Sequence, residues 1–324
     1  MSSRITLVTA SAVALAVLSV STLSAVRQDV TLRYRWTKGE TLRYRIVQQS
    51  TTTISGIPGM GDMAIDQSNT QVMATVAEDV TPERTTLRQV IESMKMEMNS
   101  PMFGASFDSA NPDTGANPMN SMLKSVLSPM IGASFTLVMA PTGEVQKVEG
   151  LSKLAEKMFQ SLPQDPAMAG ILDGLKANLS DEAMRSQLAQ VFAQFPDRPL
   201  KSGETWTTQV STPNPMLGVL ITSATSTLKA VEGEGSNRVA KIATSLTVKQ
   251  DASKPAGANP MGLTVQMGDG SGDGEQVFDA GSGRLRSSVI RSTIPMSMSG
   301  AGPDGSPMSM KTSVKTTTTM ELVQ

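Results

Sequence analysis

The chain has 324 residues, a formal net charge of −1 at pH 7, no histidine and no cysteine. A charge this close to zero provides no field to attract a phosphate backbone, so nucleic-acid binding is not expected. The missing histidine removes the usual general base, a common zinc ligand and the Ser-His and Cys-His nucleophile pairs. Without cysteine, we expect neither disulfides nor lipid anchoring, and stability has to come from a packed core.

The N-terminus has the pattern of a secretory signal peptide at residues 1–25. A single cation precedes the apolar run Ile5–Val20, and cleavage is expected after Ser24 or Ala25. An uncleaved anchor is the alternative, but the run is shorter than the roughly 20 apolar residues that span a bilayer. We therefore predict a secreted or periplasmic protein with no transmembrane span after cleavage.

Residues 26–150 are predicted to form a first β-rich half. Apolar and polar residues alternate in Val30–Trp36 and again in Leu42–Ile46, which is the period of half-buried strands. The turn between these two runs predicts a hairpin. Its outer face would carry four arginines, Arg33, Arg35, Arg43 and Arg45.

Later parts of this half alternate in the same way, at Gln71–Val80 and Thr85–Met98. Residues 100–120 are rich in proline, glycine, asparagine and serine, which predicts a mobile insertion. A short helix is predicted to close it at Met119–Leu127.

Between residues 151 and 195 the apolar spacing changes to that of helices. One face begins at Leu151, a second lies around Ile171–Leu175, and a third runs from Met184 to Phe195. Ser180 is the predicted N-cap of the third helix, because acidic residues follow it in the first turn. The segment is therefore predicted to contain two or three amphipathic helices.

Residues 196–324 are predicted to form a second β-rich half. Gly203-Glu204-Thr205 repeats Gly39-Glu40-Thr41, and the only two tryptophans, Trp36 and Trp206, lie beside the two copies. Long strand patterns and a hairpin follow in an order similar to that of the first half. The predicted fold class is α+β, with two related antiparallel β-rich halves joined by a two- to three-helix segment.

Methionine is unusually common, with 23 residues against seven phenylalanines. Thioethers suit copper(I), so Met-x-Met spacing raises the hypothesis of a methionine-based Cu(I) site. The same spacing places side chains on one buried strand face, and we favour core or lining methionines. The candidates are Met94, Met96, Met98, Met296, Met298, Met308 and Met310.

The segment Asp269–Glu275 places oxygen ligands and a glycine as the first half of an EF-hand loop does. Position 12 is Ala280 instead of a bidentate glutamate, and strands are predicted on either side. A flexible turn is therefore the favoured interpretation.

Acid–base catalysis by paired carboxylates is also not favoured. Most of the carboxylates fall in predicted turns, and no Gly-x-Ser-x-Gly, phosphate-loop or dinucleotide motif is present. The turn carboxylates are Glu40, Glu83, Glu144, Glu204, Glu232 and Asp279. No enzyme activity is predicted.

Three segments carry a resemblance to a known family: Leu32–Glu40 with Tyr44, Ala140–Val145, and Phe195–Trp206. They resemble an uncharacterised family of exported bacterial proteins of unknown function. The resemblance implies no catalytic residue. Many members carry a lipid on an N-terminal cysteine, which this sequence lacks.

These observations favour an exported, non-enzymatic binding module, with a hydrophobic small molecule as the leading ligand class. The general analogy is with periplasmic lipoprotein carriers, at the level of fold only. The alternative is a structural or protein-interaction domain of the cell envelope without a small ligand, and Cu(I) binding ranks third. No catalytic, cofactor-binding or metal-ligating residue is assigned, and no cofactor is expected.

Overall fold

The computed structural model describes residues 29–56, 61–111, 117–160, 180–214, 217–253, 264–301 and 307–323. The predicted signal peptide at residues 1–25 lies outside them. The described chain is mostly antiparallel β-sheet with few helices. Its strands are β1 (Thr41–Ser55), β2 (Met63–Val80), β3 (Thr85–Asn99), β4 (Gly104–Asp108), β5 (Ser134–Met139), β6 (Val145–Glu149), β7 (Thr205–Asn214), β8 (Gly218–Glu232), β9 (Val239–Gln250), β10 (Thr264–Met267), β11 (Gly270–Asp279), β12 (Arg284–Ala301) and β13 (Pro307–Val323).

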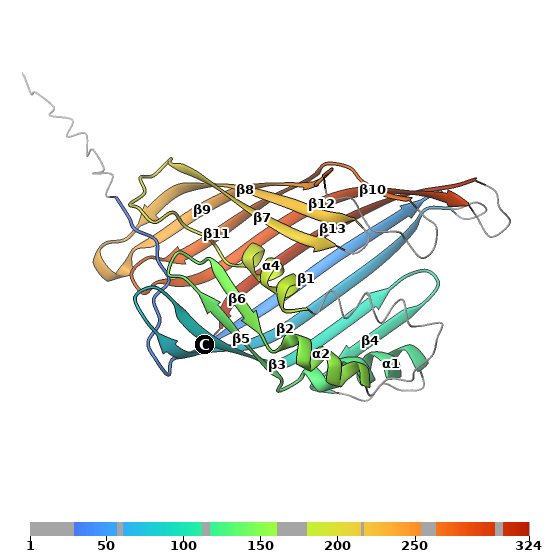
Figure 1. Ribbon diagram of the computed structural model, residues 1–324, viewed down its shortest axis with the longest axis horizontal. Coiled ribbons are helices and arrows are strands. Elements are labelled where there is room, and N and C mark those ends of the chain that lie inside the picture. Colours follow the sequence, from blue (N-terminus) through green and yellow to red (C-terminus); the bar gives the residue numbers. More distant parts are fainter. Residues whose placement is uncertain are drawn as a thin grey trace, which may run out of the picture.

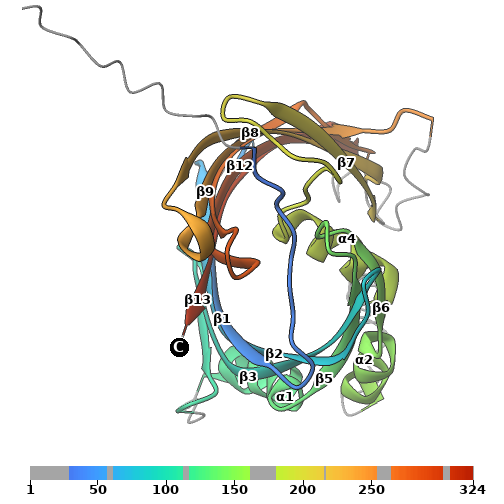
Figure 2. The same ribbon diagram turned by 90° about the vertical axis from the view of Figure 1, so that its left-hand side faces the viewer.

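These strands form a single sheet in the order β6-β5-β3-β2-β1-β13-β12-β11-β9-β8-β7, with β4 added to β3 and β10 added to β12. The first and last strands, β1 and β13, pair antiparallel in the middle of the sheet. The strands before residue 150 therefore form one side and those after residue 200 form the other. Figure 2 shows that the sheet curves into a deep trough.

The helices are α1 (Pro118–Leu127), α2 (Leu151–Gln160) and α4 (Asp181–Val191), with short 3-10 turns η1 (Ser128–Met130) and η3 (Gly235–Asn237). The predicted cap is confirmed, because the Ser180 hydroxyl accepts a hydrogen bond from Ala183 N at 3.2 Å. The predicted helix around Ile171–Leu175 lies outside the described residues.

Helix α4 contacts both edge strands, β6 and β7, and so lies across the gap between the two sides of the trough (Figure 2). Of the helices in the described part of the chain, none has the length and hydropathy that crossing a bilayer requires.

The hairpin predicted for Val30–Trp36 and Leu42–Ile46 is wrong. Strand β1 has β2 on one edge and β13 on the other, so neither edge is left for the N-terminal segment. That segment instead runs extended across the concave side of the sheet, drawn in blue in Figure 2. Tyr34 N donates to Pro141 O at 2.8 Å, and Val30 forms an isolated bridge with Leu200.

The alternation of residues 30–36 thus reports burial in the core and not strand pairing. Leu32 and Tyr34 are buried, and a second crossing segment brings Phe195 and Leu200 beside them. The Phe195 ring lies 5.8 Å from Tyr34 and 4.7 Å from Phe278, centroid to centroid. These side chains fill the end of the trough at which β1 begins, which we call the proximal end. The other end, where β1 finishes, is the distal end.

The segment predicted to be a mobile insertion, residues 100–120, contains regular structure. Residues 104–108 form β4, which pairs with the end of β3. The predicted helix is confirmed as α1, which begins at Pro118 after Asn117 caps it by accepting from Met119 N. Glycine and serine are weak strand formers, and pairing with β3 supplies what their propensity does not. The mobility of the segment stays a prediction.

The strands before residue 150 and those after residue 200 belong to one continuous sheet (Figure 1), and the two Gly-Glu-Thr turns make matching backbone contacts. Gly39 N donates to Ala77 O, and Gly203 N donates to Leu228 O, both at 2.7 Å. Both glycines have positive φ, 83° and 90°. The likeness of the two turns is therefore one of backbone geometry as well as sequence.

The turn between β11 and β12 holds the N-terminal segment in place, since Arg35 N donates to Gly283 O at 3.2 Å. Asp279 shapes this turn by accepting from Gly281 N and Ser282 N at 3.0 and 2.9 Å, and it pairs with Arg286 at 2.5 Å. Partial burial opposes ionisation of this carboxyl, but the Ser282 N–H and the Arg286 guanidinium outweigh it and hold the pKa of Asp279 below its usual value.

We expect Asp279→Asn to lower the free energy of unfolding by about 1–2 kcal/mol near neutral pH. A carboxyl with a depressed folded pKa contributes stability above its unfolded pKa of 3.8 and loses it as the pH falls through the folded value. The difference between wild type and variant should therefore shrink in acid. Urea unfolding at several pH values measures it, and a constant difference would contradict the assignment.

Candidate functional site

The concave face of the sheet encloses a cavity of about 520 Å³ beneath α4. Residues opposite one another on antiparallel strands share a face, so the strand register identifies the residues of its floor. One row runs from Ile290 through Thr318 and Gln48 to Asn69, across four neighbouring strands. The cavity is lined by Ile46, Gln48, Asn69, Gln71, Met73, Ile91, Met130, Phe135, Leu151, Met184, Leu188, Val191, Ser288, Ile290, Ser292, Thr316, Thr318 and Met320.

Apolar and polar groups are separated in this cavity. Met184, Leu188 and Val191 of α4 form its roof with other apolar side chains. The middle of the floor is a strip of uncharged amides and hydroxyls, which we call the polar strip: Gln48, Asn69, Gln71, Ser288, Ser292, Thr316 and Thr318. Among the described residues, none that lines the cavity is ionisable at neutral pH.

Asn69 is the residue of the polar strip that has a buried side-chain atom without a partner among the described residues. Its Oδ1 is shielded from solvent and accepts no hydrogen bond from the described residues. Gln89, which is 3% exposed, lies opposite Phe135 on the cavity wall, and its Nε2 is likewise without a partner among the described residues. Its Oε1 accepts from the Thr75 hydroxyl at 2.8 Å. Buried polar atoms in folded proteins are normally paired, so these two require an explanation.

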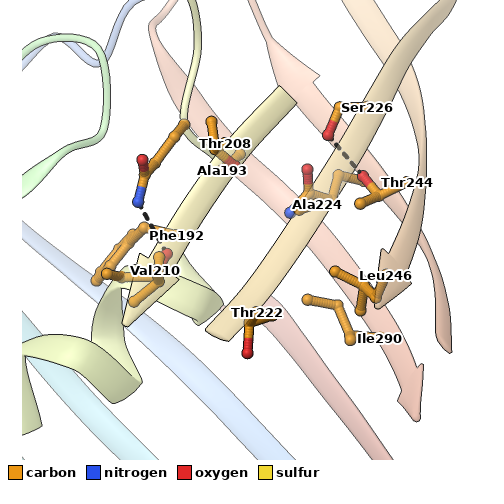
Figure 3. A pocket seen from close by; sticks show the side chains of 13 residues that line it. Phe192, Ala193, Thr208, Val210, Thr222, Ala224, Ser226, Thr244, Leu246 and Ile290 are labelled. Atoms are coloured by element: carbon orange, nitrogen blue, oxygen red, sulfur yellow. Dashed lines mark hydrogen bonds between the residues drawn. The ribbon is translucent and has the colours of Figure 1, made fainter. Parts of the chain in front are cut away.

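A smaller cavity of about 70 Å³ lies beside the first, between the end of α4 and strands β7 to β9. Figure 3 shows Phe192 and Val210 on one side of it and Leu246 and Ile290 on the other. Ser226 and Thr244 are hydrogen bonded across its wall at 2.9 Å. Ile290 lines both cavities, so the two hollows are adjacent.

Beyond the cavity, the concave face changes to methionine toward the distal end. Met298 is opposite Met310, and Met296 is opposite Met267. On the other side of the trough, Met96 is opposite Asn69 on the same face. All members of this methionine face are only partly buried; they are Met63, Met96, Met98, Met267, Met296, Met298 and Met310.

The structure thus brings together part of the methionine set that the sequence proposed for copper(I). Met296, Met298 and Met310 lie on neighbouring strands, and they are joined by Met267, which the sequence analysis did not select. The alternation of Thr264–Met267 was the signal that could have identified it. Met94 packs in a small core with Phe107 and Leu127, and Met96 packs against the same core. Met308 lies among the residues whose side chains are not described, and copper binding stays the less favoured hypothesis.

The segment Asp269–Glu275 is strand from Gly270 onward, so the expected flexible turn is wrong. Asp273 pairs with Arg291 at 3.2 Å, and Asp269 with Lys249 at 3.5 Å. The glycines permit close packing, since a Cβ on Gly272 would lie 2.3 Å from Arg291 O. The alternating Gly-x-Gly spacing is therefore explained by strand contacts.

Four of the six turn carboxylates, Glu40, Glu204, Glu232 and Asp279, form ion pairs with cations. Arg284 donates to both oxygens of Glu40 at 2.6 Å and lies over the Trp36 ring at 5.2 Å. Glu232 pairs with Lys241 at 2.7 Å, and Glu204 pairs with Arg198. These carboxylates stabilise turns and strand ends, and none of them is among the described residues that line the cavity.

The profile of a family of unknown function, DUF6263, matches residues 83–284, more than half of the chain. A search of curated proteins found no match. Among solved structures, this chain is similar to lipovitellin, described for its lipid–protein interactions, with 11% identity and a TM-score of 0.42. The alignment covers 90% of this chain but only 26% of lipovitellin. The outer membrane protein OprG from Pseudomonas aeruginosa is 8% identical with a TM-score of 0.24, over 89% of this chain and 98% of OprG. TM-scores this low establish no shared fold.

Proposed function

We propose that this chain, which belongs to the DUF6263 family of unknown function, is a non-enzymatic binding protein for a hydrophobic ligand. The observation that supports this proposal is the cavity of about 520 Å³, together with the partly buried methionine face that lies on the same side of the sheet toward the distal end. A core that served stability alone would pack these thioethers out of solvent, as happens with Met139 at 1% exposure.

The composition of the lining supports an adaptable site. Methionine is unbranched and its thioether is polarizable, so a methionine surface fits apolar ligands of different shape. The roof, α4, contacts the sheet edges β6 and β7. Apolar burial is worth about 25 cal/mol per Å², so a chain-like ligand lying along the trough would be held without any charged contact.

The same proposal includes export. Residues 1–25 have the sequence pattern of a signal peptide with cleavage after Ser24 or Ala25. We therefore propose a secreted or periplasmic carrier. A signal-peptide cleavage site determined by N-terminal sequencing of the exported protein tests this part by itself.

We also propose that the two sides of the trough are related halves. Strands β1, β2, β3, β5 and β6 are hydrogen bonded in that order, as are β7, β8, β9, β11 and β12. The matched Gly39 and Gly203 turns begin the two series. In this proposal each half supplies one wall and one segment that crosses the proximal end.

Native mass spectrometry of the exported protein, before and after organic extraction, tests the binding function. We expect a co-purifying apolar species that extraction removes, and its mass would identify the ligand class. A bare mass in both samples would overturn the proposal and favour the envelope interaction domain.

A matched variant separates hydrophobic binding from copper binding. The double change Met296→Leu and Met298→Leu keeps an apolar surface but removes two thioethers, so a hydrophobic ligand should be retained. If retention is instead lost together with Cu(I) competition against a chelator, the methionine site is a metal site.

A further inference from the structure

The polar strip limits the chemistry of the ligand. The apolar roof of the cavity faces a floor of amides and hydroxyls, and the part of the lining that the structure describes contains no lysine, arginine, aspartate or glutamate. A purely apolar molecule would leave this floor unpaired, while a charged group would enter without a counter-ion. Both arrangements are unfavourable, because buried polar groups need partners and buried charges need opposite charges.

Two buried polar atoms on this face of the sheet lack hydrogen-bond partners in the described part of the chain, and one of them belongs to the polar strip. Asn69 Oδ1 is an acceptor without a donor, and Gln89 Nε2 is a donor without an acceptor, among the described residues. Asn69 lines the cavity, and Gln89 lies beside its wall, opposite Phe135. Gln89 is opposite Thr75, six residues along β2 from Asn69, so one ligand group does not reach both atoms. A ligand group that both donates and accepts, such as a hydroxyl or an amide, suits the mixed amides and hydroxyls of the floor around Asn69.

The position of the strip fixes the orientation of the ligand. Asn69 is opposite Met96 on β3, where the methionine face begins. Along β12 the concave residues change from Ser288 and Ser292 in the cavity to Met296 and Met298 toward the distal end. A polar group on the strip therefore leaves an attached apolar chain to run along the methionine face.

We propose that the ligand is an uncharged amphiphile, with a hydroxyl- or amide-bearing polar group bound by the polar strip and an apolar chain on the methionine face. This inference rests on the proposed binding function. It goes further by excluding fatty-acid carboxylates and cationic amphiphiles as preferred ligands.

Three probes with the same 16-carbon chain test the inference on the delipidated full-length exported protein: monopalmitoylglycerol, palmitate and hexadecyltrimethylammonium. We expect the neutral probe to bind at least about tenfold more tightly than either charged probe, measured by calorimetry below micelle concentrations. Equal or tighter binding of palmitate or the cation would overturn the neutral-ligand inference while leaving a hydrophobic site intact. Binding of none of the three would instead contradict the proposed function.

A pair of variants locates the polar group. Asn69→Leu removes the unpartnered acceptor and should weaken monopalmitoylglycerol at least about fivefold, with palmitate affected less. Thr70→Val, on the opposite face of the same strand, is the matched control and should leave both affinities unchanged. If Asn69→Leu retains its melting temperature and its full preference for the neutral probe, the strip does not select the ligand.

Discussion

Replacing Phe195 with alanine is expected to lower the free energy of unfolding by about 3–5 kcal/mol. Phe195 is 5% exposed, and its ring contacts Tyr34, Phe278 and Trp206 at centroid distances of 5.8, 4.7 and 6.4 Å. These partners come from three separate parts of the chain, so no local movement can fill the space that the ring leaves. Chemical denaturation of the wild type and the variant measures the loss.

Phe103→Ala is the matched control, since the Phe103 side chain is 38% exposed. Its expected effect is within about 0.5 kcal/mol, as for most surface substitutions. A similar loss of unfolding free energy in both variants would show that the aromatic packing at the proximal end stabilises the fold no more than a surface side chain does. A loss below about 1 kcal/mol for Phe195→Ala would contradict the aromatic cluster as the main stabiliser of that end.

Replacing Thr316 with tryptophan is expected to abolish hydrophobic binding, with an affinity loss of at least about tenfold. Thr316 lies on the floor of the cavity, in the middle strand β13, and a bulky indole there occupies the space beneath α4. The hydroxyl is also lost from the polar strip. Fluorescence titration with N-phenyl-1-naphthylamine, an apolar probe, measures the affinity.

Thr317→Trp tests whether the loss of binding in Thr316→Trp comes from the position of the indole and not from its bulk alone. Thr317 is the next residue on the same strand and faces the other side of the sheet, opposite Gln49 and Arg291. We expect it to bind the probe as the wild type does. If the two variants lose binding equally at similar melting temperatures, the probe does not bind in the trough.

Local patterns predicted most of the elements. Period-two alternation identified β2 and β3, and the Ser180 cap with its acidic first turn identified the start of α4. The same rule failed at residues 30–36, because an extended segment buried on one side alternates whether or not it pairs. It failed again at Asp269–Glu275, where glycines that allow close strand contact have the composition of a turn.

The candidate site was less predictable than the fold. Its floor joins Gln48 and Asn69 to Thr318, and Thr318 lies 270 positions from Gln48 in the chain. Nothing local distinguishes these residues from polar residues on the outer face. The methionine spacing was visible, but the pairing of Met267 with Met296 depends on which strand lies beside β12.

The sequence by itself determined the chemistry available: no histidine or cysteine, few aromatic residues, abundant methionine, and a β-rich chain. Those properties follow from composition and alternation, which need no knowledge of distant neighbours. Only the tertiary structure decided that β1 pairs with β13, that the N-terminal segment crosses the proximal end, and that polar and methionine residues line one trough. These arrangements depend on the register between strands far apart in the chain, and register is set by the burial of whole faces and not by any local motif.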